Sequence, residues 1–336
     1  MPNSLFRLSI LEIPTVLRDT LAGGAESVQR VAAKMRSRDL RQIVVTGGGT
    51  SYHAALAACG HARMLAATNG PLVWTVPVGD FLASPPPLGP RDCVVAISAS
   101  GETRDIQAAK HLAGDALYIG LTNEPNSTLA RIADATLLTF AGEIRCLVHT
   151  KTFCASAFSL HRLWMELFGG DAARLGESPV LAEAMLANAD APARALARDL
   201  ANTRDAYFFG GGAAWAVALE GALKFKEACG LHAEGSETRE IDLGISTLVN
   251  ENTVVAGIDP AGDSPLVAYT LSLCRELGAP VHRFDASLLP QPYPSEFAGI
   301  LYAIPLYLAC LYLAELRGTD VDHPAWTERY YQIART

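Results

Sequence analysis

The chain contains one segment twice, and this duplication is the strongest constraint on its fold. Residues 44–56 and residues 207–219 both pass from an apolar, strand-like stretch through three glycines into an apolar, helix-like stretch. A second strand is repeated as well, because the Val-Val-Ala of residues 94–96 returns at residues 254–256. Self-similarity on this scale indicates a tandem duplication, so we expect two similar domains.

Within the first half, short apolar stretches alternate with amphipathic ones. This alternation is typical of an α/β fold, in which helices cover both faces of a parallel sheet. The expected strands lie at residues 41–46, 71–77, 92–97, 116–121 and 135–140, and the expected helices at residues 51–68 and 103–112 and from about residue 151. We divide the chain into an N-terminal segment (1–27), a first domain (28–175), a linking helix (176–200) and a second domain (201–336).

Composition excludes several classes of protein. The formal net charge is −8, with 27 Lys and Arg among 336 residues and no basic cluster, which argues against a nucleic-acid surface. The seven cysteines include no Cys-x-x-Cys pair and their number is odd, a pattern that favours reduced, buried thiols in a cytoplasmic protein. No signal peptide is apparent at the N-terminus.

Residues 297–314 form an unbroken apolar run of 18 residues, which is long enough to span a membrane. The run contains Pro305, and Tyr302, Tyr307 and Tyr312 are spread along it rather than gathered at its ends. We therefore interpret it as a helix in the core or at a dimer interface, and we expect no association with a membrane.

Two short loops of the first half have the composition of a phosphate site. Residues 47–51 read Gly-Gly-Gly-Thr-Ser, residues 98–103 read Ser-Ala-Ser-Gly-Glu-Thr, and each loop stands between a strand and a helix. Glycine lets the backbone approach an anion, the start of a helix offers free N–H groups, and small hydroxyls complete the shell. Each loop alone is also explained as a tight turn or a helix cap. Together they favour a site for phosphate or a similar anion.

The second copy lacks these hydroxyl groups. The Thr-Ser of residues 50–51 becomes Ala-Ala at residues 213–214. The Ser-Ala-Ser of residues 98–100 becomes Ile-Asp-Pro at residues 258–260, which removes an N–H group and adds a carboxylate that would repel an anion. We therefore expect phosphate in the first copy alone, which leaves the second copy free to supply the chemistry.

The second half carries charged residues on an otherwise apolar helix. Glu220, Lys224 and Glu227 follow one another at i, i+4 and i+7, which places them on one face. Surface statistics favour a solvent-exposed stripe, and the alternative is a desolvated cluster that faces a ligand, with Glu227 as a general base. His232 lies in the polar connection that follows, where a structural and a functional role are equally plausible. The acidic residues do not have metal-ligand spacing with His or Cys, so we expect no metal and no cofactor.

Five segments carry a family resemblance. They are Thr-Gly-Gly-Gly-Thr-Ser-Tyr at residues 46–52, the Ser-Ala-Ser-Gly-Glu-Thr loop, Thr-Lys-Thr-Phe at residues 150–153, residues 218–227, and Gly-Thr-Asp-Val-Asp-His-Pro at residues 318–324. In this order they resemble the sugar isomerase (SIS) domain family, and in particular the tandem-SIS isomerase half of glucosamine-6-phosphate synthase and its free-standing relatives. The resemblance covers about residues 9–336. It implies two flavodoxin-like domains, a homodimer, and a sugar-phosphate site between the domains.

The resemblance also implies roles for individual residues. Glu227 would be the base that moves a proton between C1 and C2 of the sugar, and Lys224 would support it. The backbone around Leu147 and Val148 would contact the sugar. The phosphate would be held or lined by Gly49, Thr50, Ser51, Ser98, Ala99, Ser100 and Thr103.

Two positions depart from the isomerising members of the family. Their ring-opening histidine is Leu243 here, and their C-terminal lysine, which reaches the sugar, is Arg329. Leucine cannot carry a proton, and arginine stays protonated and cannot form a Schiff base. Either the substrate arrives in open-chain form, or the histidine is replaced by His232, His149, Glu240 or Asp242.

These observations favour a phosphosugar aldose–ketose isomerase or an amino-sugar-phosphate deaminase, which removes a proton next to a carbonyl or imine. A deglycase of 6-phosphofructosyl-amines is a close alternative, because a partly acyclic substrate tolerates the loss of the ring-opening histidine. A non-catalytic sugar-phosphate sensor is the alternative from another class. Leu243 and Arg329 favour the sensor, whereas Glu227 and Lys224 oppose it.

Overall fold

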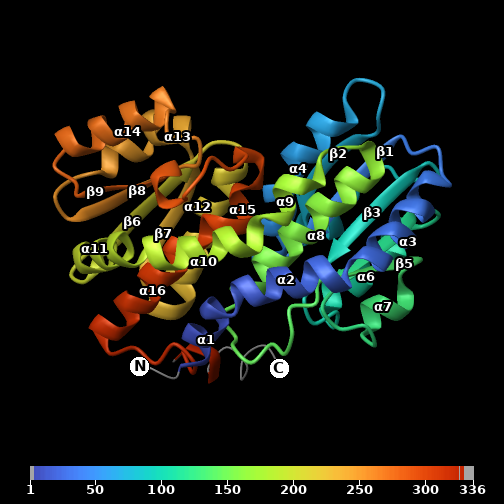
Figure 1. Cartoon of the computed structure of the whole chain (residues 1–336), viewed down its shortest axis with the longest axis horizontal. Coiled ribbons are helices and arrows are strands. Elements are labelled where there is room, and N and C mark those ends of the chain that lie inside the picture. Colours follow the sequence, from blue (N-terminus) through green and yellow to red (C-terminus); the bar gives the residue numbers. More distant parts are fainter. Residues whose placement is uncertain (1–3, 325, 329–336) are drawn as a thin grey trace.

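The computed structural model describes residues 4–324 and 326–328. Two parallel sheets, each flanked by helices, lie at opposite ends of the molecule, with helices of both halves packed between them (Figure 1). This arrangement confirms the expected α/β class and its two similar domains.

The first sheet contains five parallel strands in the order β2-β1-β3-β4-β5, which is the order of flavodoxin-like sheets. Every residue of β1, β3 and β4 is buried, because helices cover both faces. The strands are β1 (Gln42–Gly47), β2 (Leu72–Pro77), β3 (Asp92–Ile97), β4 (Leu117–Thr122) and β5 (Ala135–Leu138). The helices are α4 (Thr50–Ala66), α5 (Val78–Ala83), α6 (Arg104–Ala113), α7 (Thr128–Ile132) and α8 (Lys151–Phe168).

The second sheet repeats the first four strands, in the order β7-β6-β8-β9. Its strands are β6 (Asp205–Gly210), β7 (His232–Glu237), β8 (Thr253–Asp259) and β9 (Val281–Asp285). The helices of this half are α12 (Ala213–Cys229), α13 (Thr238–Leu243), η1 (Ile245–Leu248), α14 (Pro265–Glu276), η2 (Ala286–Leu288), η3 (Ser295–Phe297), α15 (Ala298–Leu301) and α16 (Ala303–Arg317).

Helices at the N-terminus and in the middle of the chain join the two halves. They are α1 (Leu5–Leu11), α2 (Ile13–Gly23), α9 (Ala172–Gly176), α10 (Ser178–Asn188) and α11 (Asp190–Leu200), whereas α3 (Ala25–Arg36) packs on α8 and β5 of the first domain. We expected one linking helix over residues 176–200, and the structure has two, α10 and α11. Pro192 has no N–H group with which to continue the hydrogen-bond ladder of α10, so the chain starts a new helix.

Among the described residues, one segment, Ser295–Arg317, is long and apolar enough to cross a membrane, and its most apolar 18-residue stretch is completely buried inside the protein. It packs against α11 and α12, as expected for a core helix. The largest cluster of buried apolar side chains includes residues of α4, α8, α12 and α16, so both halves share one core. All seven cysteines are buried and unpaired, in agreement with the expectation of reduced thiols.

Candidate functional site

A cleft opens where the strand order of the first sheet reverses, between the carboxyl ends of β1 and β3. The loops that follow these two strands leave the sheet in opposite directions, and α12 of the second domain closes the space between them. The resulting cavity has a volume of about 310 Å³. It is lined by Gly48, Gly49, Thr50, Ser51, Ser98, Ala99, Ser100, Thr103, His149, Thr152, Ser156, Leu223 and Glu227.

The structure therefore brings together every residue expected to hold or line the phosphate, and it places Glu227 in the same cavity. Gly49 has a φ of +51°, a conformation that glycine adopts without steric cost, and α4 begins directly after it. The positive end of the dipole of α4 thus lies at the cleft.

The second loop is organised by its own hydroxyl groups. Gly101, with a φ of +67°, donates its N–H to Ser98 Oγ at 3.0 Å. Ser98 Oγ also lies 2.8 Å from Thr103 Oγ1. The N–H of Glu102 donates to Ser100 Oγ at 3.2 Å. Because these hydrogen bonds fix the loop, its hydroxyls are held at the rim of the cavity.

Lys224 occupies the centre of a charged cluster on α12. Its Nζ lies 2.6 Å from Glu227 Oε2 and 3.4 Å from Glu220 Oε1. It also donates to Thr50 Oγ1 of the first domain, at 2.9 Å. Glu220 and Lys224 are completely buried, whereas the Glu227 side chain is 26% exposed. The interpretation of this helix face as a solvent-exposed stripe is therefore wrong.

Partners from two other helices, α4 and α16, hold Glu220 in place. His53 Nδ1 lies 2.9 Å from Glu220 Oε2, and the hydroxyls of Thr50 and Tyr307 each donate to Glu220 Oε1 at 3.2 Å. Burial raises the pKa of Glu220, but the Lys224 ammonium and the His53 hydrogen bond outweigh it and lower this pKa below its ordinary value. Burial lowers the pKa of Lys224, and the two carboxylates raise it above its ordinary value. Glu220 and Lys224 therefore both stay ionised at neutral pH.

His149 lines the same cavity, on the loop that precedes α8. Its Nδ1 lies 3.1 Å from Thr152 Oγ1. Burial and, to a lesser extent, the Lys224 cation lower the pKa of His149 to about 4. The imidazole is therefore neutral at pH 7, and it is able to exchange protons with a bound molecule.

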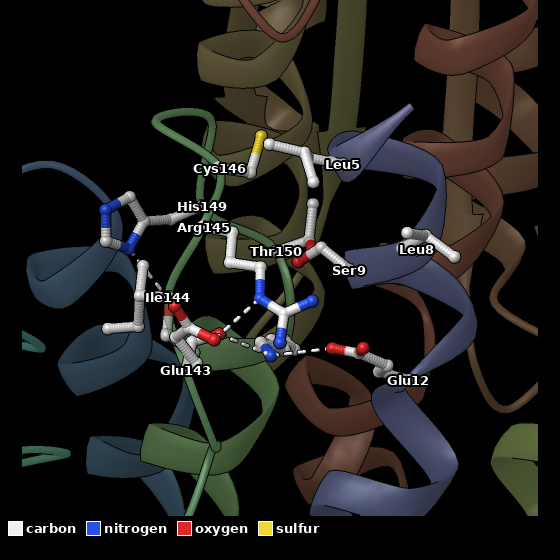
Figure 2. Close-up of a pocket in the computed structure, with 12 residues that line it drawn as sticks. Leu5, Leu8, Ser9, Glu12, Glu143, Ile144, Arg145, Cys146, His149 and Thr150 are labelled. Carbon is white, nitrogen blue, oxygen red and sulfur yellow. Dashed lines mark hydrogen bonds and ion pairs between the residues drawn. The ribbon is translucent and has the colours of Figure 1, made fainter. Parts of the chain in front are cut away.

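The N-terminal helices support the loop that carries His149. Figure 2 shows this region, in which a small cavity of about 20 Å³ separates α1 from the loop. Lys151 Nζ donates to Glu12 Oε2 at 2.7 Å and to the carbonyl oxygen of Glu143 at 2.9 Å. The hydroxyls of Ser9 and Thr150 lie 2.6 Å apart. These contacts tie the segment before α8 to α1 and α2.

The structure does not bring His232 to the cleft. His232 is the first residue of β7, so it lies at the amino edge of the sheet, opposite the edge where the loops of a parallel sheet form a site. Its side chain is exposed, and its Nδ1 lies 2.7 Å from Asp205 Oδ1 of the neighbouring strand. The contact is a surface pair outside the cavity.

Other expected site residues lie near the cleft or outside it. Leu147 is exposed and Val148 is buried, and neither side chain lines the cavity, although His149 beside them does. Arg329 lies outside the described residues. Leu243, like Glu240 and Asp242, lies on α13, which does not line the cavity. No group of three His, Cys, Asp or Glu side chains suited to a metal ion was found in the described part of the chain.

Several residues of the site were not expected from the sequence. His53 lies one turn after Thr50 on α4, so the helical spacing alone was a usable signal. Tyr307 comes from α16, far away in the sequence, and only the packing of α16 on α12 brings it to Glu220. Thr152 and Ser156 lie one turn apart at the start of α8 and face the cavity together.

The fold and the cleft define a class of parallel α/β proteins with a hydroxyl-lined pocket at the point of strand reversal and a charged helix opposite. The chain belongs to the SIS domain family, whose profile matches residues 38–165 and 199–287.

Known relatives agree with this assignment. The isomerizing glutamine–fructose-6-phosphate aminotransferase of Pyrococcus horikoshii is 33% identical over 340 residues, which cover 94% of this chain and 55% of the relative. The chain thus spans about half the length of the curated relatives it matches. The structure of a candidate phosphosugar isomerase from Silicibacter pomeroyi is 29% identical, with a TM-score of 0.81 over 95% of this chain and 100% of that one. The glucosamine-6-phosphate deaminase of Thermotoga maritima shares the fold, with 21% identity and a TM-score of 0.77 over 94% of this chain and 97% of that one.

Proposed function

We propose that the protein is an enzyme that binds a sugar phosphate in this cleft and transfers a proton at the carbon next to a carbonyl or imine. The activity would be that of an aldose–ketose isomerase or an amino-sugar-phosphate deaminase. One observation carries the proposal: the carboxylate of Glu227 shares a 310 Å³ cavity with two hydroxyl-rich loops. The cavity thus joins a cradle for an anion to a group that can accept a proton.

The phosphate end is supported by the lining of the cavity. Ser51, Ser98, Ser100 and Thr103 present hydroxyls, and α4 begins beside Gly49. Such groups stabilise an anion without a basic side chain. This suits a chain of net charge −8, in which the selectivity for an anion has to come from local dipoles.

The proton-transfer end is supported by the cluster on α12. Glu227 is partly exposed to the cavity, and its Oε2 accepts a hydrogen bond from the buried Lys224. The ammonium orients the carboxylate and stabilises negative charge that develops on an enediol or enamine oxygen nearby. Glu220 is a positioning residue, because it acts on the site through Lys224 and Thr50.

We assign to His149 the proton transfers that open a sugar ring. Leu243 cannot perform them, and the neutral imidazole of His149 lies in the cavity with Glu227. When a furanose opens, the C2–O5 bond breaks, the anomeric hydroxyl loses its proton and O5 gains one. An imidazole beside the ring is able to accept the first proton and return one to O5.

The proposal is tested by isotope exchange. The protein would be incubated in deuterated water with fructose 6-phosphate, glucosamine 6-phosphate and a 6-phosphofructosyl amino acid, and deuterium uptake at C1 and C2 and amine release followed by NMR. We expect exchange with at least one of these compounds, reduced about 10²- to 10⁴-fold in Glu227→Gln. Glu234→Gln, an exposed glutamate on β7, is the matched control and should leave the rate unchanged.

The three compounds also separate the alternatives. Deuterium uptake with fructose 6-phosphate alone identifies an isomerase. Release of ammonia from glucosamine 6-phosphate identifies a deaminase, and release of the amino acid from the 6-phosphofructosyl amino acid identifies a deglycase. Saturable binding without exchange or amine release from any of them would refute the enzyme and support the sensor.

A further inference from the structure

A second cavity, with a volume of about 300 Å³, lies at the corresponding place in the second domain. It opens where the order of the second sheet reverses, between β6 and β8, and α4 covers it as α12 covers the first cavity. Aligning Gly210 with Gly47 also aligns Lys224 with His61 and Glu227 with Met64. The duplication has therefore produced two cavities at equivalent positions, which have nearly equal volumes and different linings.

The glycine turn keeps its backbone shape in the second cavity. Gly212 has φ +59° and ψ −126°, against φ +51° and ψ −125° at Gly49. Within the described residues, the N–H groups of Gly212 and Ala213 have no hydrogen-bond partner. They lie at the start of α12, a helix of 17 residues, where the backbone favours a negative group.

The expected repulsion of anions by Asp259 is wrong for this cavity. The Asp259 side chain is buried, and it accepts hydrogen bonds from the N–H groups of Gly262 and Ser264, each at 3.2 Å. It is also paired with the guanidinium of Arg283. Its charge is thus neutralised inside its own turn, and Pro260 is the residue of this turn that lines the cavity.

Two opposite charges face the second cavity without being paired. Arg63 of α4, which is exposed, and Glu296 of η3, which is half-buried, both line it, and in the described part of the chain neither forms an ion pair or a hydrogen bond. His61 lines the cavity as well and is 6% exposed. Its Nδ1 lies 3.0 Å from His161 Nδ1, and the structure gives its Nε2 no partner among the described residues. Burial lowers the pKa of His61, so this ring adds no charge at neutral pH.

We propose that the second cavity binds a free α-amino acid with an apolar side chain. The carboxylate would meet the amides of Gly212 and Ala213 and the guanidinium of Arg63. The ammonium would meet Glu296, and the side chain would pack on the indole of Trp215. A zwitterion satisfies both unpaired charges at once, whereas a neutral sugar leaves both unpaired. A phosphate dianion would be repelled by the carboxylate of Glu296, and the methyl groups that replace the hydroxyls of the first copy cannot donate hydrogen bonds to it.

This site does not depend on the activity of the first cavity, although the two share their walls. α12 begins at the second cavity and ends at the first, and α4 runs between them in the opposite sense. A ligand that orders one end of these helices therefore has a direct physical path to the other cavity.

The test is isothermal titration calorimetry of the whole protein with each of the twenty standard amino acids. We expect one-to-one binding of at least one apolar amino acid, weakened about tenfold or more in Arg63→Gln and in Glu296→Gln. Arg198→Gln and Glu276→Gln, which change exposed residues of α11 and α14, are the matched controls and should bind as the wild type does. The methyl ester of the bound amino acid and its 2-hydroxy acid analogue should each bind about tenfold more weakly.

Three results would overturn the proposal. They are the absence of saturable binding for all twenty amino acids at about 10 mM, equal binding by the Arg63 and Glu296 variants, and Arg63-dependent binding of glucose or inorganic phosphate instead. The readout needs no turnover, so an inactive first cavity would not imitate any of them.

Discussion

The ammonium of Lys224 donates a hydrogen bond to the hydroxyl of Thr50, at 2.9 Å, across the boundary between the two domains. Thr50 belongs to the glycine loop of the first domain, and Lys224 to the helix of the second that carries Glu227. Through this contact the loop that we assign to phosphate and the cluster that we assign to proton transfer are held in one geometry. A shift between the domains would disturb both parts of the site together.

Lys224→Met should strongly destabilise the fold. The substitution leaves the completely buried Glu220 without its cation, and breaking a buried ion pair from one side costs about 3–5 kcal/mol. Urea denaturation followed by circular dichroism measures the change. Lys226→Met, on the exposed face of the same helix, should change stability by less than about 0.5 kcal/mol. The double variant Glu220→Gln/Lys224→Met should lose less free energy of unfolding than the two single variants lose together. Strict additivity of the losses would contradict the coupling between Glu220 and Lys224.

Gly101→Ala should disrupt the second loop of the first cavity. A Cβ at this position would lie 2.1 Å from Ser127 Oγ, and its φ of +67° is strained for alanine. Gly114→Ala is the control, because its φ of +54° brings backbone strain while a Cβ there has no neighbour within 4 Å. Titration with a sugar phosphate should show affinity weakened by more than about tenfold in the first variant only. Equal loss in both variants would indicate a general effect on folding.

His149 should make the protein less stable in acid. Its pKa of about 4 in the folded chain is lower than the ordinary value of about 6.5, so the unfolded chain binds the proton more readily. This group therefore leaves stability unaffected well above pH 6.5, and the free energy of unfolding falls as the pH decreases towards 4, by about 2–3 kcal/mol at about pH 4.5. His149→Asn should remove this part of the loss, as measured by urea denaturation at pH 7 and at about pH 4.5. The same measurements on the variant with the exposed His111 replaced by Asn are the control for a His→Asn change outside the cavity.

His149→Ala should slow exchange only with substrates that have a ring to open. Fructose 6-phosphate closes through O5, whereas 5-deoxyfructose 6-phosphate has no O5 and remains acyclic. We expect a loss of about 10²-fold or more with the first compound and a nearly unchanged rate with the second. Glu227→Gln should lose activity on both. A similar loss on both compounds in His149→Ala would assign His149 to positioning or to the enolisation step.

The homodimer implied by the family resemblance remains a prediction. Leu243, Leu248 and Tyr269 each expose more than half of their surface, on α13, η1 and α14, and α13 contacts both of the other elements. Exposed apolar side chains in one region indicate an interface. Sedimentation equilibrium should give twice the chain mass of 35.7 kDa, and Leu248→Asp should shift the equilibrium towards monomer. Leu72→Asp, on the edge strand β2, is the control and should remain dimeric.

The sequence predicted the loops of the site better than its charged residues. Two glycine- and serine-rich loops after parallel strands meet for a topological reason, since carboxyl ends of neighbouring strands share one edge of the sheet. The burial of Glu220 and Lys224 could not be predicted in this way, because charged residues on a helix usually face solvent. His232 was expected at the site because of its chemistry. It is the first residue of β7, so it lies at the amino edge of the sheet, away from the cavity.

By itself the sequence determined the α/β class, the duplication and the position of the phosphate-like loops, because periodicity and turn chemistry are local properties of a chain. Only the tertiary structure decided which charges are buried and what they meet. Tyr307 and His53 reach Glu220 from other helices, and Arg283 neutralises Asp259 from a neighbouring strand. The electrostatics of both cavities depends on such long-range neighbours, since the strength of a charge in a protein is set by burial and by partners that need not be close in sequence.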